Sequence, residues 1–267
     1  MVRWVRWVYT VWVGICFIVP LVAFLPLFLI YPVFGFRANL WLASVTMLVW
    51  FRLFLLLVGI RLRIIDPHGY RRLRPAVLVT NHTSFLDTPV VKTALGFNFL
   101  PLGKKEQSRT PVLGWIYRHN VVLVDRSSAE SRARSFQFMD GLLKRAIGVF
   151  VFPEGTMNRG PLLLKSFYDG AFRLSIENQV PVVPFAVTAT RLIMPRGVFP
   201  LQLPRPVTVA FGPPILPNGA TEADLPRLKQ AGYDAVFDLL SAHAPAGTPG
   251  LGGAKAPLEP ARARPDA

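Results

Sequence analysis

The chain has 267 residues, of which 52% are hydrophobic, and a formal net charge of +15. This size fits one substantial domain with an appendage. The charge favours polyanionic partners, and an anionic lipid surface suits the apolar content better than nucleic acid does. Cys16 is the single cysteine and the histidines lack metal-ligand spacing, which excludes an intrachain disulfide and leads us to expect neither a metal nor another cofactor.

Residues 1–60 contain two apolar runs. No charged residue lies between Arg6 and Arg37. This run exceeds both the roughly 20 residues of a membrane-spanning helix and the apolar part of a signal peptide, about 7–15 residues. A second run over 38–60 is interrupted only by Arg52. We therefore predict that residues 1–60 form a membrane-anchoring helical hairpin.

Arginine residues flank both ends of this hairpin: Arg3, Arg6, Arg61, Arg63, Arg71, Arg72 and Arg74. The positive-inside rule predicts that both ends, and the domain that follows, lie on the cytoplasmic face of a membrane, which is the inner membrane in a bacterium. Two full spans and a re-entrant hairpin within one leaflet both remain open, because Arg37 and Arg52 are costly in a simple pair of spans. Two core helices of a soluble domain are a third alternative, which would leave the hairpin without a solvated face.

From residue 61 onward, short apolar runs typical of buried strands alternate with amphipathic stretches. The predicted strands cover 61–66, 76–80, 121–125, 148–152, 183–187 and 207–211. One helix is predicted to begin near Leu86, another to cover 131–146, and a third to follow a capping box at 221–224. This alternation indicates an α/β domain over 61–243, with a mixed, mostly parallel sheet flanked by helices. Residues 244–267 are rich in Pro, Gly and Ala and are predicted to be a disordered tail.

The stretch TNHTSFLDT at 80–88 contains His82 and Asp87, five positions apart. On one continuous helix these side chains would diverge by about 140° and would not touch. They meet only if His82 lies in the turn after the strand and Asp87 in the first turn of the helix, where the helix dipole favours a carboxylate. The pair would then act as a general base, with Asp87 accepting one imidazole N–H while the other nitrogen takes a proton from a hydroxyl. The alternative is an aspartate that caps the helix beside an incidental histidine.

Four stretches in chain order resemble the motifs of the glycerolipid acyltransferase family, which includes the 1-acylglycerol-3-phosphate O-acyltransferases: NHTSFLD (81–87), NVVLVDR (120–126), FPEGTMN (152–158) and VPVVPF (180–185). Two further stretches resemble the family's segment before the second motif, namely GKKE (103–106) and TPVLGW (110–115). The resemblance covers roughly residues 60–215, and the apolar hairpin is similar to that of many bacterial members. The order and spacing of the motifs make the resemblance more specific than any single motif would.

The resemblance implies direct acyl transfer from a thioester to an alcohol, with His82 as the general base and Asp87 as the residue that orients it. It also implies a set of substrate-binding residues: Asn81, Lys104, Arg126, Glu154, Gly155 and Thr156. The backbone N–H groups of Gly155 and Thr156 are candidate donors to the tetrahedral oxyanion. The guanidinium of Arg126, which follows a predicted strand, would clamp a phosphate.

Structural roles remain open for several of these residues. Glu154 can be a carboxylate that is satisfied within the fold. Arg126 can pair with the neighbouring Asp125, and Lys104 can be a solvated surface residue. Ser84 lies within the first motif, but the chain has no GxSxG sequence, which argues against an acyl-serine intermediate.

The chain also departs from the family's pattern. Asn120 stands where a glycine is usual, Met157 and Asn158 stand where Arg and Ser are common, and FYDGAF (167–172) lacks the lysines of the family's FKKGAF-like run. Lys165 is a candidate replacement for those lysines. Because these positions belong to the acceptor-headgroup site that the resemblance implies, they leave the acceptor more open than the chemistry.

The expected protein is a membrane-associated O-acyltransferase of phospholipid biosynthesis. It would transfer a fatty acyl group from acyl-CoA or acyl carrier protein to 1-acylglycerol 3-phosphate, giving phosphatidate. Its expected partners are these substrates and an anionic membrane surface, without nucleic acid. One alternative keeps the chemistry and changes the acceptor to another lysophospholipid or a lyso-aminolipid, and a second is a non-catalytic membrane protein that binds lipid.

Overall fold

The computed structural model describes residues 2–96, 99–104, 108, 114–115, 118, 122–124 and 129–257. Its α-helices are α1 (Val2–Ile30), α2 (Phe36–Leu57), α3 (Asp87–Leu95), α5 (Ala129–Leu143), α6 (Gly170–Asn178), α7 (Thr190–Ile193) and α8 (Leu225–His243). Its 3₁₀ helices include η1 (Tyr31–Phe34), η2 (Tyr70–Arg72) and η4 (Glu222–Asp224). Its strands are β1 (Leu62–Ile65), β2 (Val77–Val79), β3 (Phe99–Lys104), β4 (Val122–Val124), β5 (Gly148–Val151), β6 (Val182–Val187) and β7 (Val207–Phe211).

In the described part of the chain, the strands form one sheet in the order β1–β7–β6–β2–β5–β3–β4. Neighbouring strands are parallel except for β6 and β7, which run antiparallel. The predicted α/β fold with a mixed, mostly parallel sheet is therefore confirmed. Val79 of β2 lies opposite Val151 of β5 and Pro184 of β6. The segments that follow β2 and β5 consequently leave the sheet side by side, where ligand sites of open α/β sheets tend to lie.

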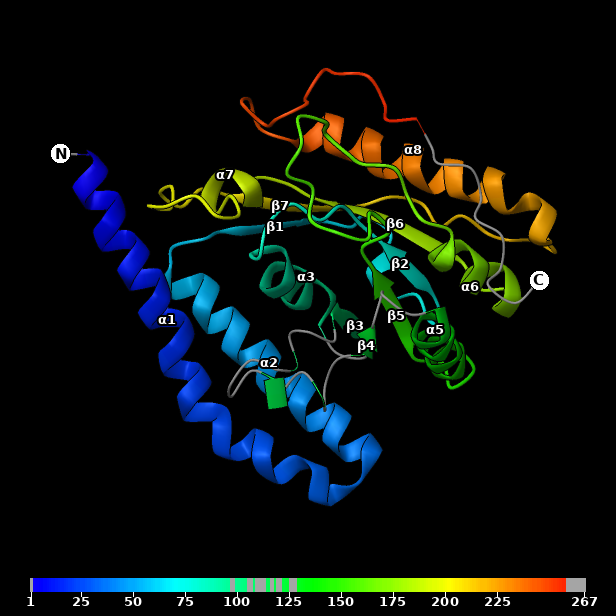
Figure 1. Ribbon diagram of the computed structural model, residues 1–267, viewed down its shortest axis with the longest axis horizontal. Helices are drawn as coiled ribbons and strands as arrows, with labels where there is room; N and C mark the ends of the chain where they lie inside the picture. The colour runs from blue at the N-terminus through cyan, green and yellow to red at the C-terminus, as the bar shows by residue number, and fades with distance from the viewer. Residues whose placement is uncertain are drawn as a thin grey trace.

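Helices cover both faces of this sheet. Helices α5, α6 and α8 form an apolar core on one face, and α3 together with the α1–α2 hairpin forms a core on the other; Figure 1 shows α8 above the sheet and the hairpin below it. Alternate residues of β2 enter the two cores, with Val77 and Val79 in the first and Leu78 in the second. A strand that is buried on both faces reads as an uninterrupted apolar run, which explains why these strands were predictable from the sequence.

The predicted strands correspond to β1, β2, β4, β5, β6 and β7, and the helix predicted near Leu86 corresponds to α3. The predicted capping box is present at η4, where the backbone N–H of Thr221 donates to Oδ2 of Asp224 at 3.0 Å. Strand β3 was not predicted, because Pro101 and Gly103 interrupt its apolar pattern and both residue types are depleted in strands.

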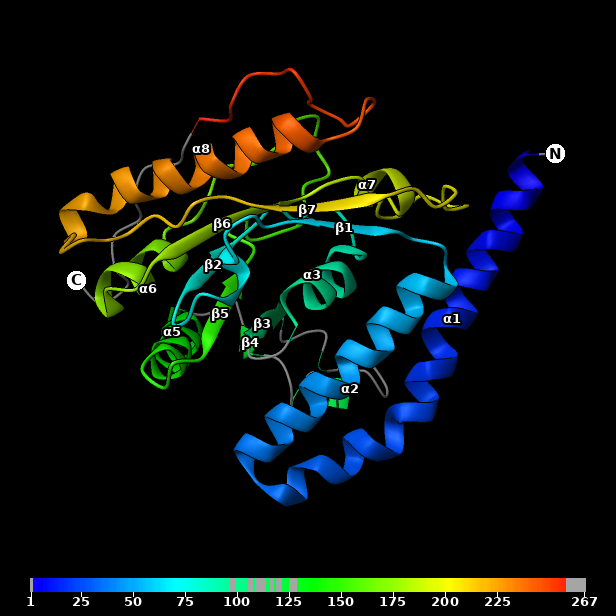
Figure 2. The same ribbon diagram turned by 180° about the vertical axis from the view of Figure 1, so that it is seen from behind.

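The predicted helical hairpin is also present, with α1 and α2 joined by η1 and lying against each other (Figure 2). Helix α1 continues through Pro20 and Pro26, whereas Pro32 lies in η1. Among the described residues, one helix, Arg3–Phe34, is long and apolar enough to cross a membrane. The apolar part of the second helix, Trp41–Leu57, is shorter than that requirement.

The hairpin is docked on the α/β domain through the first half of α1 and the end of α2. Val13 and Cys16 of α1 and Phe54 of α2 enter the same apolar core as Val90 and Phe185 of the domain. At the contact between α2 and α3, the buried side chain of Lys92 donates to the hydroxyl of Ser44. Burial lowers the pKa of Lys92 to about 8. The far end of the hairpin has a separate apolar cluster that contains Phe28, Tyr31 and Trp50.

Residues 244–257 differ from the predicted disordered tail, because they pack against α8. The ammonium of Lys255 pairs with Asp234 at 2.5 Å, and the backbone N–H of Ala256 donates to the hydroxyl of Tyr233 at 2.8 Å. Gly250 lies against the backbone of Leu162 and Leu163, in the loop that follows the third motif. These contacts are tertiary, so a Pro/Gly/Ala-rich composition without periodicity gives no sign of them. Residues 258–267 lie outside the described residues.

Candidate active site

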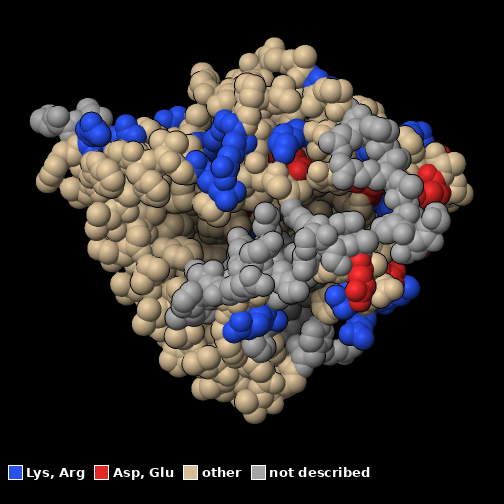
Figure 3. Space-filling view, in the orientation of Figure 1, with Lys and Arg blue, Asp and Glu red and all other residues tan. Residues whose placement is uncertain are grey.

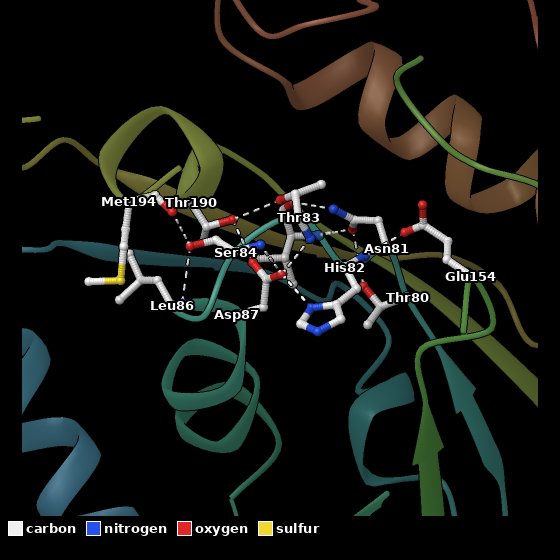
Figure 4. Close-up of polar contacts among 11 residues, drawn as sticks. Thr80, Asn81, His82, Thr83, Ser84, Leu86, Asp87, Glu154, Thr190 and Met194 are labelled. Atoms are coloured by element: carbon white, nitrogen blue, oxygen red, sulfur yellow. Dashed lines mark hydrogen bonds and ion pairs between the residues drawn. The ribbon is translucent and has the colours of Figure 1, made fainter. Parts of the chain in front are cut away.

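The turn between β2 and α3 brings His82 and Asp87 together, as their spacing predicted (Figure 4). Nδ1 of His82 lies 2.9 Å from Oδ2 of Asp87. Because a carboxylate accepts hydrogen bonds, Nδ1 carries the proton and the lone pair of the ring is on Nε2. That second nitrogen points away from Asp87 (Figure 4), and none of the described residues forms a hydrogen bond with it. This is the geometry of a histidine that is oriented to accept a proton.

Asp87 is fully buried and accepts hydrogen bonds from three further groups. Its Oδ2 accepts the backbone N–H groups of Thr83 and Ser84 at 2.7 and 2.8 Å. Its Oδ1 accepts the hydroxyl of Thr190, the first residue of α7, at 2.5 Å. The carboxylate therefore binds back to the turn that precedes α3 and does not cap that helix. One side chain fixes both the path of the turn and the orientation of the His82 ring.

The third motif holds the main chain of His82 in place. The backbone N–H of His82 donates to Oε1 of Glu154 at 2.6 Å, and its carbonyl accepts the backbone N–H of Asn158 at 2.7 Å. The imidazole stacks on the ring of Phe152, with centroids 4.0 Å apart and planes inclined by 15°. The side chain of His82 is 16% exposed, so the ring is not completely buried.

Glu154 is buried and hydrogen-bonded within the protein, and its predicted role in substrate binding stays a prediction. Its side chain is 1% exposed, and its second oxygen, Oε2, accepts the backbone N–H of Lys165 at 3.0 Å. Burial raises the pKa of the Glu154 carboxyl to about 8, although its hydrogen bonds with the backbone of His82 and Lys165 act in the opposite direction. These two hydrogen bonds fit the alternative interpretation, in which the Glu154 carboxyl group serves the fold.

Asn81 and the backbone of Gly155 and Thr156 are also engaged within the protein. The amide of Asn81 is buried, accepts the N–H of Val187 at 2.8 Å and donates to its carbonyl at 2.9 Å, which joins β2 to β6. The N–H groups of Gly155 and Thr156 donate to the carbonyls of Phe152 and Glu154 at 3.0 and 2.8 Å. Both N–H groups thus have partners within the protein in this structure, and their role as donors to the oxyanion stays a prediction.

Two further residues of the predicted site are Lys104, whose backbone the structure describes, and Arg126. Lys104 is the last residue of β3 and lies opposite Val124 of β4, at the same edge of the sheet as the turn that holds His82. Arg126 lies outside the described residues. The hydroxyl of Ser84 is buried, donates to the carbonyl of Met194 at 2.7 Å and accepts the N–H of Leu86 at 3.1 Å, so it is not available as a nucleophile.

Two residues that position the pair, Thr190 and Asn158, were not predicted to do so from the sequence. Thr190 binds Asp87 from 103 positions away along the chain, and a lone threonine carries no motif. Asn158 was recognised only as a departure from the family's pattern. In the structure it is buried, and its side chain accepts the N–H of Gly160 at 3.0 Å and donates to the carbonyl of Leu162 at 2.9 Å. Its amide shapes the loop whose backbone holds His82.

The charge on the surface is unevenly distributed. Figure 3 shows lysine and arginine side chains along the upper part of one face, above a hollow, and a broad uncharged surface over the hairpin. Among the described residues, no group of three or more His, Cys, Asp and Glu side chains is placed to hold a metal ion. The lysine and arginine side chains give the upper part of this face a positive charge, which suits anionic substrates.

The model of the family described as Acyltransferase matches residues 61–188, the segment that contains His82, Asp87 and Glu154. Residues 61–188, about half of the chain, are therefore similar to the acyltransferases, which indicates an enzyme of that class. It is 29% identical over 202 residues to the 1-acyl-sn-glycerol-3-phosphate acyltransferase alpha of Mus musculus, covering 74% of this chain and 68% of the mouse protein. It is 37% identical over 124 residues to a chloroplastic 1-acyl-sn-glycerol-3-phosphate acyltransferase of Arabidopsis thaliana, covering 46% of this chain and 34% of that protein.

A solved structure supports the fold. The crystal structure of the 1-acyl-sn-glycerophosphate acyltransferase PlsC from Thermotoga maritima aligns with a TM-score of 0.68 and 19% sequence identity, covering 88% of this chain and 97% of that one. At this identity the likeness establishes the arrangement of the helices and strands. The similarity between the two chains therefore extends over most of their length and not only over the motifs.

Proposed function

We propose that this protein transfers a fatty acyl group from acyl-CoA or acyl carrier protein to 1-acylglycerol 3-phosphate, giving phosphatidate. The observation that carries this proposal is the bonded His82–Asp87 pair, with its free Nε2, in a domain that is similar to the acyltransferases. The acceptor is suggested by the relatives from mouse and Arabidopsis, whose names state the same substrate.

The geometry supports a single-displacement reaction. Nε2 of His82 would take the proton of the acceptor hydroxyl while the hydroxyl oxygen attacks the thioester carbon. The C–S bond would then break, and the departing thiolate would receive that proton from the imidazolium. Asp87 would stabilise the charged ring and keep Nδ1 protonated throughout. The buried, doubly bonded hydroxyl of Ser84 argues against an acyl-serine intermediate.

Glu154 would act as a positioning residue. It accepts the N–H of His82 on one oxygen and the N–H of Lys165 on the other, so one carboxylate joins the base to the loop that follows the third motif. The ammonium of Lys165 donates to the exposed hydroxyl of Thr156 at 3.0 Å. We propose that Lys165, together with Arg126 and Lys104, contacts the anionic groups of the substrates.

The hairpin supports a location at the cytoplasmic surface of a membrane. Its outer face exposes large apolar side chains along the whole of α1, including Trp4, Val11, Val22 and Ile30. A lysophosphatidate and a long-chain thioester both partition to such a surface. Because the apolar part of α2 is short, we favour a hairpin that enters one leaflet over two complete spans.

A second acceptor remains a candidate because of one ion pair. Asp169 stands where the family's FKKGAF-like run has a lysine, and it pairs with the buried ammonium of Lys229 at 2.7 Å. In the family this position would supply a cation to the acceptor headgroup. Here it holds Asp169, whose carboxylate is already paired with Lys229. This favours testing lysophospholipids with other headgroups and lyso-aminolipids beside 1-acylglycerol 3-phosphate.

The proposal is tested by an acyl-transfer assay on membranes that contain the protein. The assay combines labelled acyl-CoA or acyl carrier protein thioester with a panel of lysolipids, and compares the protein with His82→Ala. His68→Ala is the matched control, because His68 is exposed and its ring lies beside that of Tyr70, with centroids 5.2 Å apart. We expect transfer to 1-acylglycerol 3-phosphate that is lost in His82→Ala and retained in His68→Ala.

Each other outcome changes a different part of the proposal. Transfer to another lysolipid alone would keep the chemistry and replace the acceptor. Retained transfer in His82→Ala would remove the assignment of the base. Transfer to none of the acceptors would favour a membrane protein that binds lipid without turnover.

A further inference from the structure

The loop between α7 and β7 carries exposed apolar side chains that the catalytic site does not use. Val198 is 49% exposed, Phe199 64% and Leu203 44%. The loop is nonetheless ordered by its own backbone, because Val198 N–H donates to the carbonyl of Pro195 and Gln202 N–H to that of Ile193. A defined loop that holds large apolar side chains in water marks a contact with another apolar phase or partner.

This loop is fastened to the beginning of the membrane hairpin. The guanidinium of Arg6 donates to the carbonyls of Pro200 and Leu201 at 2.7 and 3.1 Å, and the N–H of Leu201 donates to the hydroxyl of Thr10 at 2.9 Å. Leu201 itself is buried in the core that the hairpin shares with the domain. The exposed side chains of the loop are therefore held at a fixed place beside the first turns of α1.

Arg6 also sets the depth at which the loop lies. It is the last charged residue before the charge-free run that extends to Arg37. Whether the hairpin spans a bilayer or enters one leaflet, the guanidinium of Arg6 belongs at the boundary between the headgroups and the acyl chains. The carbonyls that it binds are at the same level, and so are Val198 and Phe199 next to them in the chain.

The charge around the loop suits an anionic lipid surface. No Asp or Glu occurs in residues 1–65 or in residues 178–221, whereas Arg3 and Arg6 lie on α1 and Arg196 and Arg205 flank the loop. Arginine residues near an anionic membrane are attracted to its negatively charged headgroups. Exposed tryptophans at Trp4 and Trp7 on α1 add the aromatic residues typical of a membrane interface.

We propose that Val198 and Phe199 form a second membrane contact, which inserts at the boundary of headgroups and acyl chains in an anionic bilayer. This inference rests on the membrane location that was proposed above and adds a contact from the catalytic domain itself. The contact adjoins the active site, because the guanidinium of Arg196 lies 5.2 Å from the ring centroid of Phe85 and the carbonyl of Met194 accepts the hydroxyl of Ser84. The turn that holds His82 is consequently tied to a segment at the lipid surface.

The test places a fluorophore at single cysteines in the full chain, after Cys16→Ala removes the native thiol. Phe199→Cys reports on the loop, Val33→Cys on the tip of the hairpin, where the side chain is 83% exposed, and Asp238→Cys on α8, where it is 70% exposed. The labelled proteins are reconstituted in vesicles of phosphatidylcholine and phosphatidylglycerol, with and without brominated acyl chains. Bromine quenches only a fluorophore that reaches the acyl chains.

We expect brominated lipid to quench the label at positions 33 and 199 and to leave the label at 238 unchanged. Quenching at 33 with none at 199 would overturn the second contact and leave the hairpin anchor intact. No quenching at either position would overturn the membrane location itself, and with it this inference. Thermal unfolding of each variant checks that Phe199→Cys keeps the fold, and Val198→Cys is the substitute if it does not.

Discussion

The turn between β2 and α3 and the α1–α2 hairpin distribute polar and apolar side chains in opposite ways. In the turn, the polar side chains of Asn81, Ser84 and Asp87 are at most 1% exposed, and each is hydrogen-bonded. On the hairpin, large apolar side chains such as Trp4 at 71% and Leu56 at 75% face outward. Buried polar groups raise the free energy only when they are unpaired, which those of the turn are not, whereas apolar surface raises it wherever it is exposed to water.

This difference in side-chain burial shows that the two regions depend on different interactions. The turn is precise because every buried polar atom finds a partner, several of them on distant segments, so the His82 ring is held by the whole domain. The two helices of the hairpin are joined mainly by apolar contacts with single side-chain bonds, such as that of Trp12 to Leu57, and they expose an apolar surface that suits a membrane. Disrupting one bond should therefore affect the turn more than the hairpin, and the following predictions test this from the largest expected effect to the smallest.

Asp87→Asn should have the largest effect on catalysis. The amide removes the charge that stabilises the imidazolium and permits the wrong tautomer, so kcat should fall by about 10²–10⁴-fold. Thr190→Val is the matched control, since it removes one donor to Oδ1 and leaves the bond between Asp87 and His82 intact. Steady-state kinetics should show a much smaller loss for Thr190→Val, and equal losses would mean that the carboxylate serves the fold more than the ring.

Gly250→Ala should detach the C-terminal segment from the loop at 158–165. A Cβ at Gly250 would lie 2.1 Å from the backbone nitrogen of Leu163, and φ is +78°. Gly252→Ala has nearly the same strain, with φ of +79°, but no atom within 4 Å. We expect Gly252→Ala to cost about 1 kcal/mol of unfolding free energy and Gly250→Ala to cost more, with faster proteolysis after residue 243. Similar costs for the two variants would show that the segment is not packed in solution.

Glu154→Gln should change how stability depends on pH. Burial raises the pKa of Glu154 from 4.5 to about 8, so the folded protein binds a proton that the unfolded chain releases within this window. The free energy of unfolding of the unmodified protein should therefore fall as the pH rises from 4.5 to 8, relative to Glu154→Gln. Denaturant titrations at both ends of the window measure this difference, and a constant difference would show that the carboxyl is not shifted upward.

Trp12→Phe should have the smallest effect. The indole N–H of Trp12 donates to the carbonyl of Leu57 at 2.9 Å across the hairpin. Its loss should lower the free energy of unfolding in detergent by about 1 kcal/mol. Trp4→Phe, which changes an exposed ring without such a bond among the described residues, should be neutral. A large loss for Trp12→Phe would weaken the contrast between the two regions, because it would make the hairpin depend on a single polar contact.

Local sequence patterns predicted most of the helices and strands of this protein. The apolar runs predicted the strands that are buried on both faces, and the charge-free stretch predicted the hairpin. The pairing of His82 with Asp87 was also predictable, because they lie five positions apart and one turn joins them. Strand β3 and the packing of residues 244–257 were not, since Pro101, Gly103 and a Pro/Gly/Ala-rich segment carry the opposite local preference.

The sequence by itself determined most of the elements, the residues that are chemically able to act, and the resemblance to the glycerolipid acyltransferases. Only the tertiary structure decided the roles of Glu154, Asn81 and the backbone at Gly155, because their partners are main-chain groups that no side-chain motif records. It also decided that Thr190 supports Asp87 and that the loop after α7 lies beside Arg6. Side-chain identity fixes what a residue can donate or accept, and the folded backbone fixes which of those groups remain free for a substrate.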